Sequence, residues 1–135
     1  MKERILAFMA DMKSHDVNRI STWFCEDSML WIPPAQPVSG LSRIRALFRA
    51  MLNRYDFLEW TIIDILPVAE NRCIHICNSR GKLKGCEEYC NRVVTDIVFN
   101  EEGKIISLSD YFKDTSVFST AIPSQRQVML ESHQK

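Results

Sequence analysis

Apolar residues recur at helical spacing in the first half of the chain. Between positions 2 and 13, and again between 42 and 52, they repeat every three or four residues and cover one face of an amphipathic helix. Ser42 is a suitable cap for the later helix. A shorter helix between them, capped by Ser14 or Asp16, carries apolar residues from Val17 to Phe24 and ends in the polar turn 26–28. The sequence therefore predicts three helices.

The second half of the chain has the composition of a β-sheet. Segments 57–68, 72–82, 87–99 and 104–112 are rich in β-branched and aromatic residues, and polar or glycine-containing turns separate them. A short strand from Met29 to Ile32 precedes them, and two prolines end it. Helices followed by an antiparallel meander predict an α+β fold, in which three helices pack on a strongly curved sheet and close a cone with an internal cavity.

The size and charge of the chain narrow the class of protein. With 135 residues, of which 46% are apolar, it suits a single domain, which we assign to residues 1–118 with a polar tail over 119–135. Lys and Arg number 17, and Asp and Glu also number 17, so no net positive charge draws the protein to nucleic acid or an anionic membrane. A small, largely neutral molecule is the expected partner.

The sequence predicts a protein without a targeting signal. Its N-terminus lacks a long apolar segment followed by a small-residue cleavage site, and no stretch approaches the roughly 18 apolar residues of a membrane span. We therefore expect a cytoplasmic protein. In that reducing compartment the five cysteines are expected to remain reduced as small buried side chains.

One acidic residue stands in an otherwise apolar row. Asp110 shares a face of the last strand with Ile106, Leu108 and Phe112. A carboxyl group in apolar surroundings suits proton transfer near neutral pH, because desolvation disfavours its charged form. The alternative is an ordinary aspartate on the solvent side of an edge strand. We predict Asp110 as a catalytic acid/base, with Leu108 and Phe112 beside the substrate.

His75 has the least polar sequence neighbours of the three histidines. Its ordinary pKa near neutrality suits acid/base catalysis, whereas a core histidine bonded to the backbone is the alternative. Glu59 has matching parity, but it lies about 20 Å away along a straight strand. Glu88 is the competing partner, because a turn centred on positions 81 and 82 would place it directly opposite His75.

The same turn would place Cys77 opposite Cys86 and Cys73 opposite Cys90. Cysteines four residues apart on one strand are separated by about 13 Å, which is too far to share a tetrahedral zinc ion. Cross-strand disulfides are strained and uncommon inside cells. We expect neither a metal site nor disulfides.

Large apolar side chains are candidates for the wall of the predicted cavity. Trp31, Phe48, Met51 and Trp60 could contact a polycyclic ligand, because ligand cavities are mostly apolar with a few polar groups. Segment 57–63 presents apolar residues on both faces of its strand. One face of the sheet is therefore expected to pair with a second copy in a homodimer.

Two motifs resemble those of a known family. The segment from Trp31 to Gly40, and above all the run 98–106 followed by Asp110, Tyr111 and Phe112, is similar to the SnoaL-like polyketide cyclases. Their relatives in the NTF2-like superfamily are the ketosteroid isomerases and limonene-epoxide hydrolases. The resemblance covers roughly residues 1–118 and implies the NTF2-like cone.

In the epoxide hydrolases of this family, the acid that matches Asp110 activates water. A tyrosine and an asparagine hold that water, and the matching positions here are Leu30 and Ile32, which are apolar. The hydrolase's arginine and second aspartate lie on the strand that corresponds to 72–80, where this chain has the run from Ile74 to Asn78. The resemblance therefore implies a retained acid without the partners for epoxide hydrolysis.

Fungal members that isomerise or lactonise meroterpenoid rings are similar in length, and that similarity points to Glu59 and His75 as a catalytic pair. We expect an isomerase or cyclase that uses no cofactor and acts on a hydrophobic polycyclic metabolite, with Glu59, His75 and Asp110 as catalytic residues. The predicted substrate contacts are Trp31, Met51, Glu88, Leu108 and Phe112. The alternatives are a non-catalytic binding or dimerisation module and an epoxide hydrolase.

Overall fold

The computed structural model describes residues 1–118, so the predicted tail over 119–135 lies outside the described residues. The helices and strands in this range follow the predicted order. They are α1 (Lys2–Ser14), α2 (Val17–Ser21), β1 (Phe24–Trp31), β2 (Val38–Ser39), α3 (Leu41–Asn53), β3 (Tyr55–Ala69), β4 (Arg72–Leu83), β5 (Glu88–Phe99) and β6 (Ile105–Phe112).

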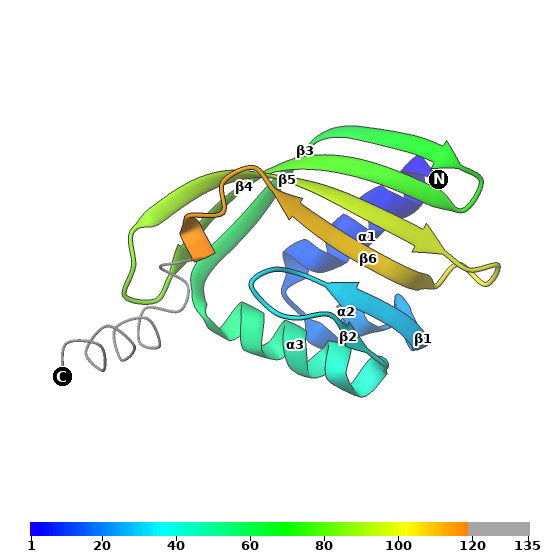
Figure 1. Cartoon of the computed structure of the whole chain (residues 1–135), viewed down its shortest axis with the longest axis horizontal. Coiled ribbons are helices and arrows are strands. Elements are labelled where there is room, and N and C mark those ends of the chain that lie inside the picture. Colours follow the sequence, from blue (N-terminus) through cyan, green and yellow to red (C-terminus); the bar gives the residue numbers. More distant parts are fainter. Residues whose placement is uncertain (119–135) are drawn as a thin grey trace.

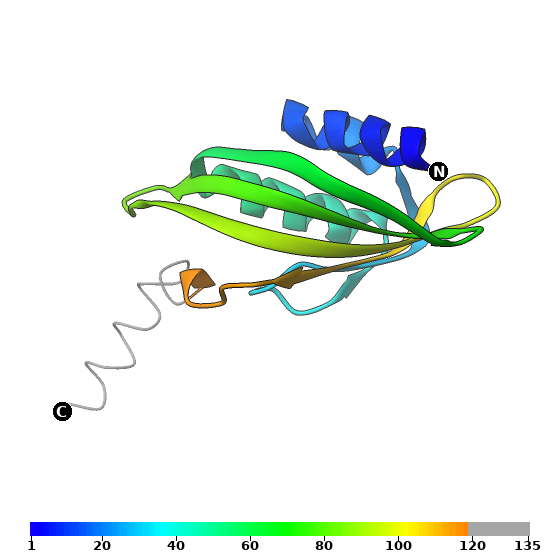
Figure 2. The same ribbon diagram turned by 90° about the horizontal axis from the view of Figure 1, so that it is seen from above.

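The strands of residues 1–118 form one sheet in the order β2-β1-β6-β5-β4-β3. Strands β3 to β6 form the predicted antiparallel meander, and β1 lies parallel to β6. Figures 1 and 2 show that the sheet curves strongly and stays open, with the helices packed against it. The predicted α+β architecture is confirmed.

The capping pattern predicted one helix start correctly and another wrongly. Asp16 rather than Ser14 caps α2, since its Oδ1 accepts a hydrogen bond from the backbone N–H of Asn18 at 2.9 Å. Helix α3 begins directly after Gly40, whose positive φ of 89° turns the chain into the helix. Ser42 already lies inside α3, so the predicted cap at Ser42 was wrong.

Strand β1 starts earlier than the sequence pattern indicated. Helix α2 ends at Ser21 and β1 begins at Phe24, so the predictions of a helix through Phe24 and a turn over 26–28 were wrong. The N–H of Ile105 donates to the carbonyl of Trp23 at 2.7 Å and draws this segment into the sheet beside β6. Pairing with a strand far along the chain therefore overrides the local helical pattern.

Ser28 joins β1 to β6 where the register between these strands is irregular. It is fully buried, and its Oγ accepts from the N–H of Cys25 at 2.8 Å and donates to the carbonyl of Ile105. Ser28→Ala removes a buried partner from both backbone groups, so we expect the free energy of unfolding to fall by about 1–3 kcal/mol. Urea denaturation measures this change, with Ser39→Ala on the exposed part of β2 as the control. Equal losses in both variants would contradict this role for Ser28.

The turn between β4 and β5 lies further along the chain than predicted. Strand β4 continues to Leu83, and His75 pairs with Thr95 instead of Glu88. The predicted turn at 81–82 was wrong because Gly81 lies inside the strand, where an added Cβ would come within 3.1 Å of three neighbouring side chains. Glycine at this position permits close packing and does not make a turn.

A β-bulge in β3 separates Glu59 from His75. Between Ile62 and Asp64 the pairing of β3 with β4 skips one residue. The extra residue inverts the alternation of β3, so side chains before and after the bulge that would share a face lie on opposite faces. Glu59 pairs with Arg80 on the outer face, whereas His75 lies on the inner face and is 2% exposed. The prediction that Glu59 and His75 share a face was therefore wrong.

The cysteines lie in a different register from the one predicted. Cys73 and Cys77 are buried opposite apolar residues of β5, so the predicted pairs with Cys90 and Cys86 do not form. Each of the five cysteines is outside a disulfide. Within residues 1–118, no three potential metal ligands lie together, and no helix has the length and apolar character needed to cross a membrane.

Candidate active site

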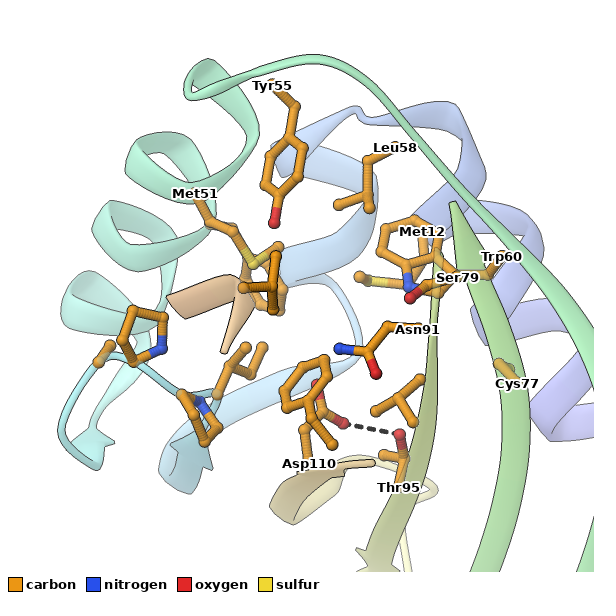
Figure 3. Close-up of a pocket in the computed structure, with 18 of the residues that line it drawn as sticks. Met12, Met51, Tyr55, Leu58, Trp60, Cys77, Ser79, Asn91, Thr95 and Asp110 are labelled. Carbon is orange, nitrogen blue, oxygen red and sulfur yellow. Dashed lines mark hydrogen bonds between the residues drawn. The ribbon is translucent and has the colours of Figure 1, made fainter. Parts of the chain in front are cut away.

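A cavity of about 140 Å³ lies between the helices and the inner face of the sheet. Its wall is mostly apolar, and the few polar side chains come mainly from β4, β5 and β6 (Figure 3). The apolar wall includes Phe48, Met51, Leu58, Trp60, Leu108 and Phe112. This composition is typical of a small-molecule site.

Asp110 is the acidic group of the cavity. It lies on β6, and the hydroxyl of Thr95 on β5 donates to its Oδ1 at 2.6 Å, as the dashed line in Figure 3 shows. Burial raises the pKa of Asp110 to about 6, and the hydrogen bond from Thr95 lowers that pKa in part. Asp110 can therefore exchange protons near neutral pH.

His75, Thr95 and Asp110 form one row across three neighbouring strands. His75 pairs with Thr95, and Thr95 pairs with Asp110. Neighbouring strands lie about 5 Å apart, so Thr95 stands between the imidazole and the carboxyl group. Burial lowers the pKa of His75 to about 4, and its Nδ1 has no hydrogen-bond partner within residues 1–118. His75 is therefore a neutral imidazole at pH 7.

Asn91 also lines the cavity, but its amide holds the chain that follows β6. Its Nδ2 donates to the carbonyl of Asp114 at 2.9 Å, and its Oδ1 accepts from the N–H of Asp114 at 3.0 Å. The neighbouring Val117 and Phe118 form part of the cavity wall. Asn91 thus positions one side of the site.

A pair of tyrosines provides a second polar group. The hydroxyls of Tyr55 on β3 and Tyr89 on β5 lie 2.9 Å apart in a hydrogen bond, and both residues line the cavity. Burial is the largest cause of a raised pKa at Tyr89, and the bond with Tyr55 raises that pKa further. Figure 3 shows Tyr55 on the opposite side of the cavity from Asp110.

The structure brings together most of the residues predicted for the site. Asp110, His75, Met51, Leu108 and Phe112 line the same cavity. The prediction that the face of Asp110 is an inner face is correct, because β6 lies between β1 and β5 rather than at an edge of the sheet.

Three predicted site residues lie elsewhere. Trp31 is 47% exposed, because the alternation of β1 directs the preceding Leu30 into the core. Glu59 and Glu88 lie on exposed strand positions, where they form ion pairs with Arg80 at 3.6 Å and 3.0 Å. The predictions that these side chains line the cavity or partner His75 were wrong.

Three polar residues of the cavity were not predicted from the sequence, namely Thr95, Tyr55 and Tyr89. The turn between Asn100 and Gly103 pairs Phe99 with Ile105, and that pairing alone would put position 95 opposite Ser109. A register shift between Val98 and Phe99, which the sequence pattern does not reveal, brings Thr95 opposite Asp110. The two tyrosines meet through the close packing at Gly81, and strand alternation carries no signal of that contact.

Residues 5–108 match the family model of the SnoaL-like domain. The chain belongs to the SnoaL-like family. Among curated proteins, no match is found for this SnoaL-like protein.

Solved structures share the fold of this SnoaL-like protein at low sequence identity. TerC co-crystallized with polyporic acid is 17% identical, with a TM-score of 0.76 over 90% of this chain and 97% of TerC. A putative SnoaL-like polyketide cyclase from Shewanella denitrificans is 16% identical, with a TM-score of 0.75 over 91% and 96%. SalBIII, an epoxide hydrolase/cyclase-like enzyme in pyran ring formation, is 14% identical, with a TM-score of 0.74 over 84% and 91%. These similarities confirm the cone fold.

Proposed function

We propose that this SnoaL-like protein is an acid/base isomerase or cyclase that rearranges a ring of a polycyclic secondary metabolite such as a meroterpenoid. The observation that carries the proposal is the Asp110 carboxyl group, whose pKa of about 6 results from burial in a mostly apolar cavity. The solved structures with this fold include a putative polyketide cyclase and SalBIII, an enzyme in pyran ring formation, which supports the same class of reaction.

Asp110 would act first as a base and then as an acid. Thr95 holds Oδ1, so Oδ2 is the oxygen that can accept a proton from the substrate. The same carboxyl group then returns the proton to another atom of the bound molecule, which leaves the composition of the substrate unchanged. The apolar wall limits exchange of this proton with water.

His75 has a different role from the catalytic acid/base role that was predicted from the sequence. Its lowered pKa keeps the imidazole neutral at pH 7, and it lies on the opposite sheet face from Glu59. A neutral imidazole can hold a hydroxyl or carbonyl of the substrate by a hydrogen bond. His75 therefore orients the substrate beside Asp110.

The size of the cavity limits how much of the substrate it encloses. A cavity of about 140 Å³ is close to the roughly 150 Å³ that accommodates benzene in another apolar protein interior. The reacting ring would occupy this space. Other rings would lie against the exposed Pro34 and its neighbours, which border the cavity between β1 and β2.

Product analysis tests the proposal. Wild-type protein is incubated with a panel of terpenoids and polyketides, and the products are separated and weighed by mass spectrometry. An isomer with the mass of its substrate supports the proposal. A product that incorporates ¹⁸O from solvent would instead indicate epoxide hydrolysis, although Leu30 and Ile32 supply no polar group to hold water. Ligands that bind and return unchanged would indicate a binding module.

Thr95→Val is expected to move the pH dependence of turnover. The Thr95 hydrogen bond lowers the pKa of Asp110, so its removal raises that pKa and shifts the acidic limb of kcat/KM to higher pH. Activity at pH 6 should therefore fall more than activity at pH 8. Initial rates from pH 5 to 9 measure the shift, and Thr61→Val at an exposed position of β3 is the control. A uniform loss at every pH would show that Thr95 does not tune Asp110.

A further inference from the structure

The tyrosine pair lies beside a glycine of strand β4, which stands between β3 and β5. Gly81 pairs with Leu58 on one side and with Tyr89 on the other. A Cβ at Gly81 would lie 3.1 Å from Tyr55 Cε1 and 3.1 Å from the Tyr89 hydroxyl. The missing side chain therefore leaves the space in which the two rings approach each other.

The pair always has one hydrogen left to donate. Two neutral phenols carry two hydroxyl hydrogens, and the bond between Tyr55 and Tyr89 uses one of them. The raised pKa of Tyr89 keeps its hydroxyl protonated at physiological pH. Because both residues line the cavity, the remaining hydrogen is available to an acceptor on a bound molecule.

The tyrosine pair and Asp110 lie at different ends of the cavity. Tyr89 is six positions before Thr95 on β5, which corresponds to roughly 20 Å along an extended strand. Figure 3 shows Tyr55 and Asp110 on opposite sides, with Met51, Leu58 and Met12 around the space between them. A ligand that satisfies both ends must carry a hydrogen-bond acceptor at the tyrosine end of an apolar ring system and a group that can lose a proton at the Asp110 end.

We infer that the Tyr55–Tyr89 pair donates a hydrogen bond to a carbonyl oxygen of the substrate, at the end remote from Asp110. The substrate class is thus a ring ketone, quinone or lactone whose carbonyl lies across the ring system from the group that exchanges its proton with Asp110. This inference rests on the proposed function, because it describes the substrate of the same cavity. The tyrosines act here as specificity-determining residues.

Binding of matched probes tests the inference without turnover. Acetophenone and ethylbenzene differ by a carbonyl, and 2-acetylnaphthalene and 2-ethylnaphthalene differ in the same way on a larger ring system. Each pair therefore tests the tyrosine end of the cavity alone. Isothermal titration calorimetry gives each Kd. In wild type, the ketone of at least one pair should bind roughly 3–10-fold more tightly than its ethyl analogue, since a neutral hydrogen bond has about this effect.

Either phenol can donate alone, so Tyr55→Phe and Tyr89→Phe should each retain part of the ketone preference. The double variant should bind the ketone and its ethyl analogue equally, with the affinity for the ethyl analogue unchanged. Tyr111→Phe, at a tyrosine that is 61% exposed, is the matched control.

Two results would overturn the inference: no ketone preference in wild type for either pair, or an unchanged preference in the double variant. The melting temperature of each variant shows whether it is folded. If the double variant is unfolded, Tyr55→Phe and Tyr89→Phe take its place, and an unchanged preference in both also overturns the inference. If wild type prefers the ketone but converts no compound, the proposed function is rejected and the hydrogen bond from the tyrosines is supported. If turnover depends on Asp110 but the double variant keeps the ketone preference, this inference is rejected and the proposed function is supported.

Discussion

Asp110→Asn is expected to reduce kcat by roughly 10²–10⁴-fold on any substrate that the wild-type protein converts, which is the usual contribution of a general acid or base. The amide keeps the shape of the carboxyl group but cannot accept and return a proton. The amide oxygen of the substituted side chain can still accept the Thr95 hydrogen bond, so the local structure should persist. Steady-state kinetics at pH 7 measure the loss.

Glu59→Gln is the matched control for this experiment. Both acids were predicted from the sequence to be catalytic, whereas Glu59 lies on the outer face with its side chain 63% exposed and paired with Arg80. Its substitution should leave turnover unchanged. Loss of activity in Glu59→Gln, or full activity in Asp110→Asn, would reject the Asp110 site.

The second large effect is on the pH dependence of stability, where Asp110 and His75 act in opposite directions. The pKa of Asp110 is raised from 3.8 to about 6, so the folded state binds more protons than the unfolded state between these values. The Asp110 contribution therefore weakens folding as pH rises. The pKa of His75 is lowered from 6.5 to about 4, so the unfolded state binds more protons in that window. The His75 contribution weakens folding as pH falls.

Single variants should separate these two contributions. Between pH 4 and pH 7, the free energy of unfolding of Asp110→Asn relative to wild type should increase by about 2 kcal/mol, because the variant avoids the buried charge. For His75→Gln, the free energy of unfolding relative to wild type should decrease by about 3 kcal/mol between pH 4 and pH 7. This variant should therefore be most stable, relative to wild type, at pH 4. Urea denaturation at pH 4, 5, 6 and 7 measures both differences. Differences from wild type that stay constant across this range would show that neither group is perturbed by burial.

The strongest sequence patterns were local, and these are the patterns that the structure confirms. Helical spacing predicted α1 and α3, and the turn from Asn100 to Gly103 predicted the hairpin of β5 and β6. Strand alternation placed Asp110 on the same face as Leu108 and Phe112, and all three line the cavity. These features depend on residues that are close in sequence, where the periods of helix and strand apply directly.

By itself the sequence determined the α+β order of elements, the acid of the site and part of the apolar wall. The tertiary structure decided which groups meet that acid. One extra residue in β3 turned Glu59 away from His75, and the packing at Gly81 moved the turn that would have brought Glu88 opposite His75. A register shift between Val98 and Phe99 brought Thr95 opposite Asp110, where it donates a hydrogen bond to the carboxyl group. A bulge or a close contact shifts register by whole residues, and every such shift of one residue inverts the face of all side chains beyond it.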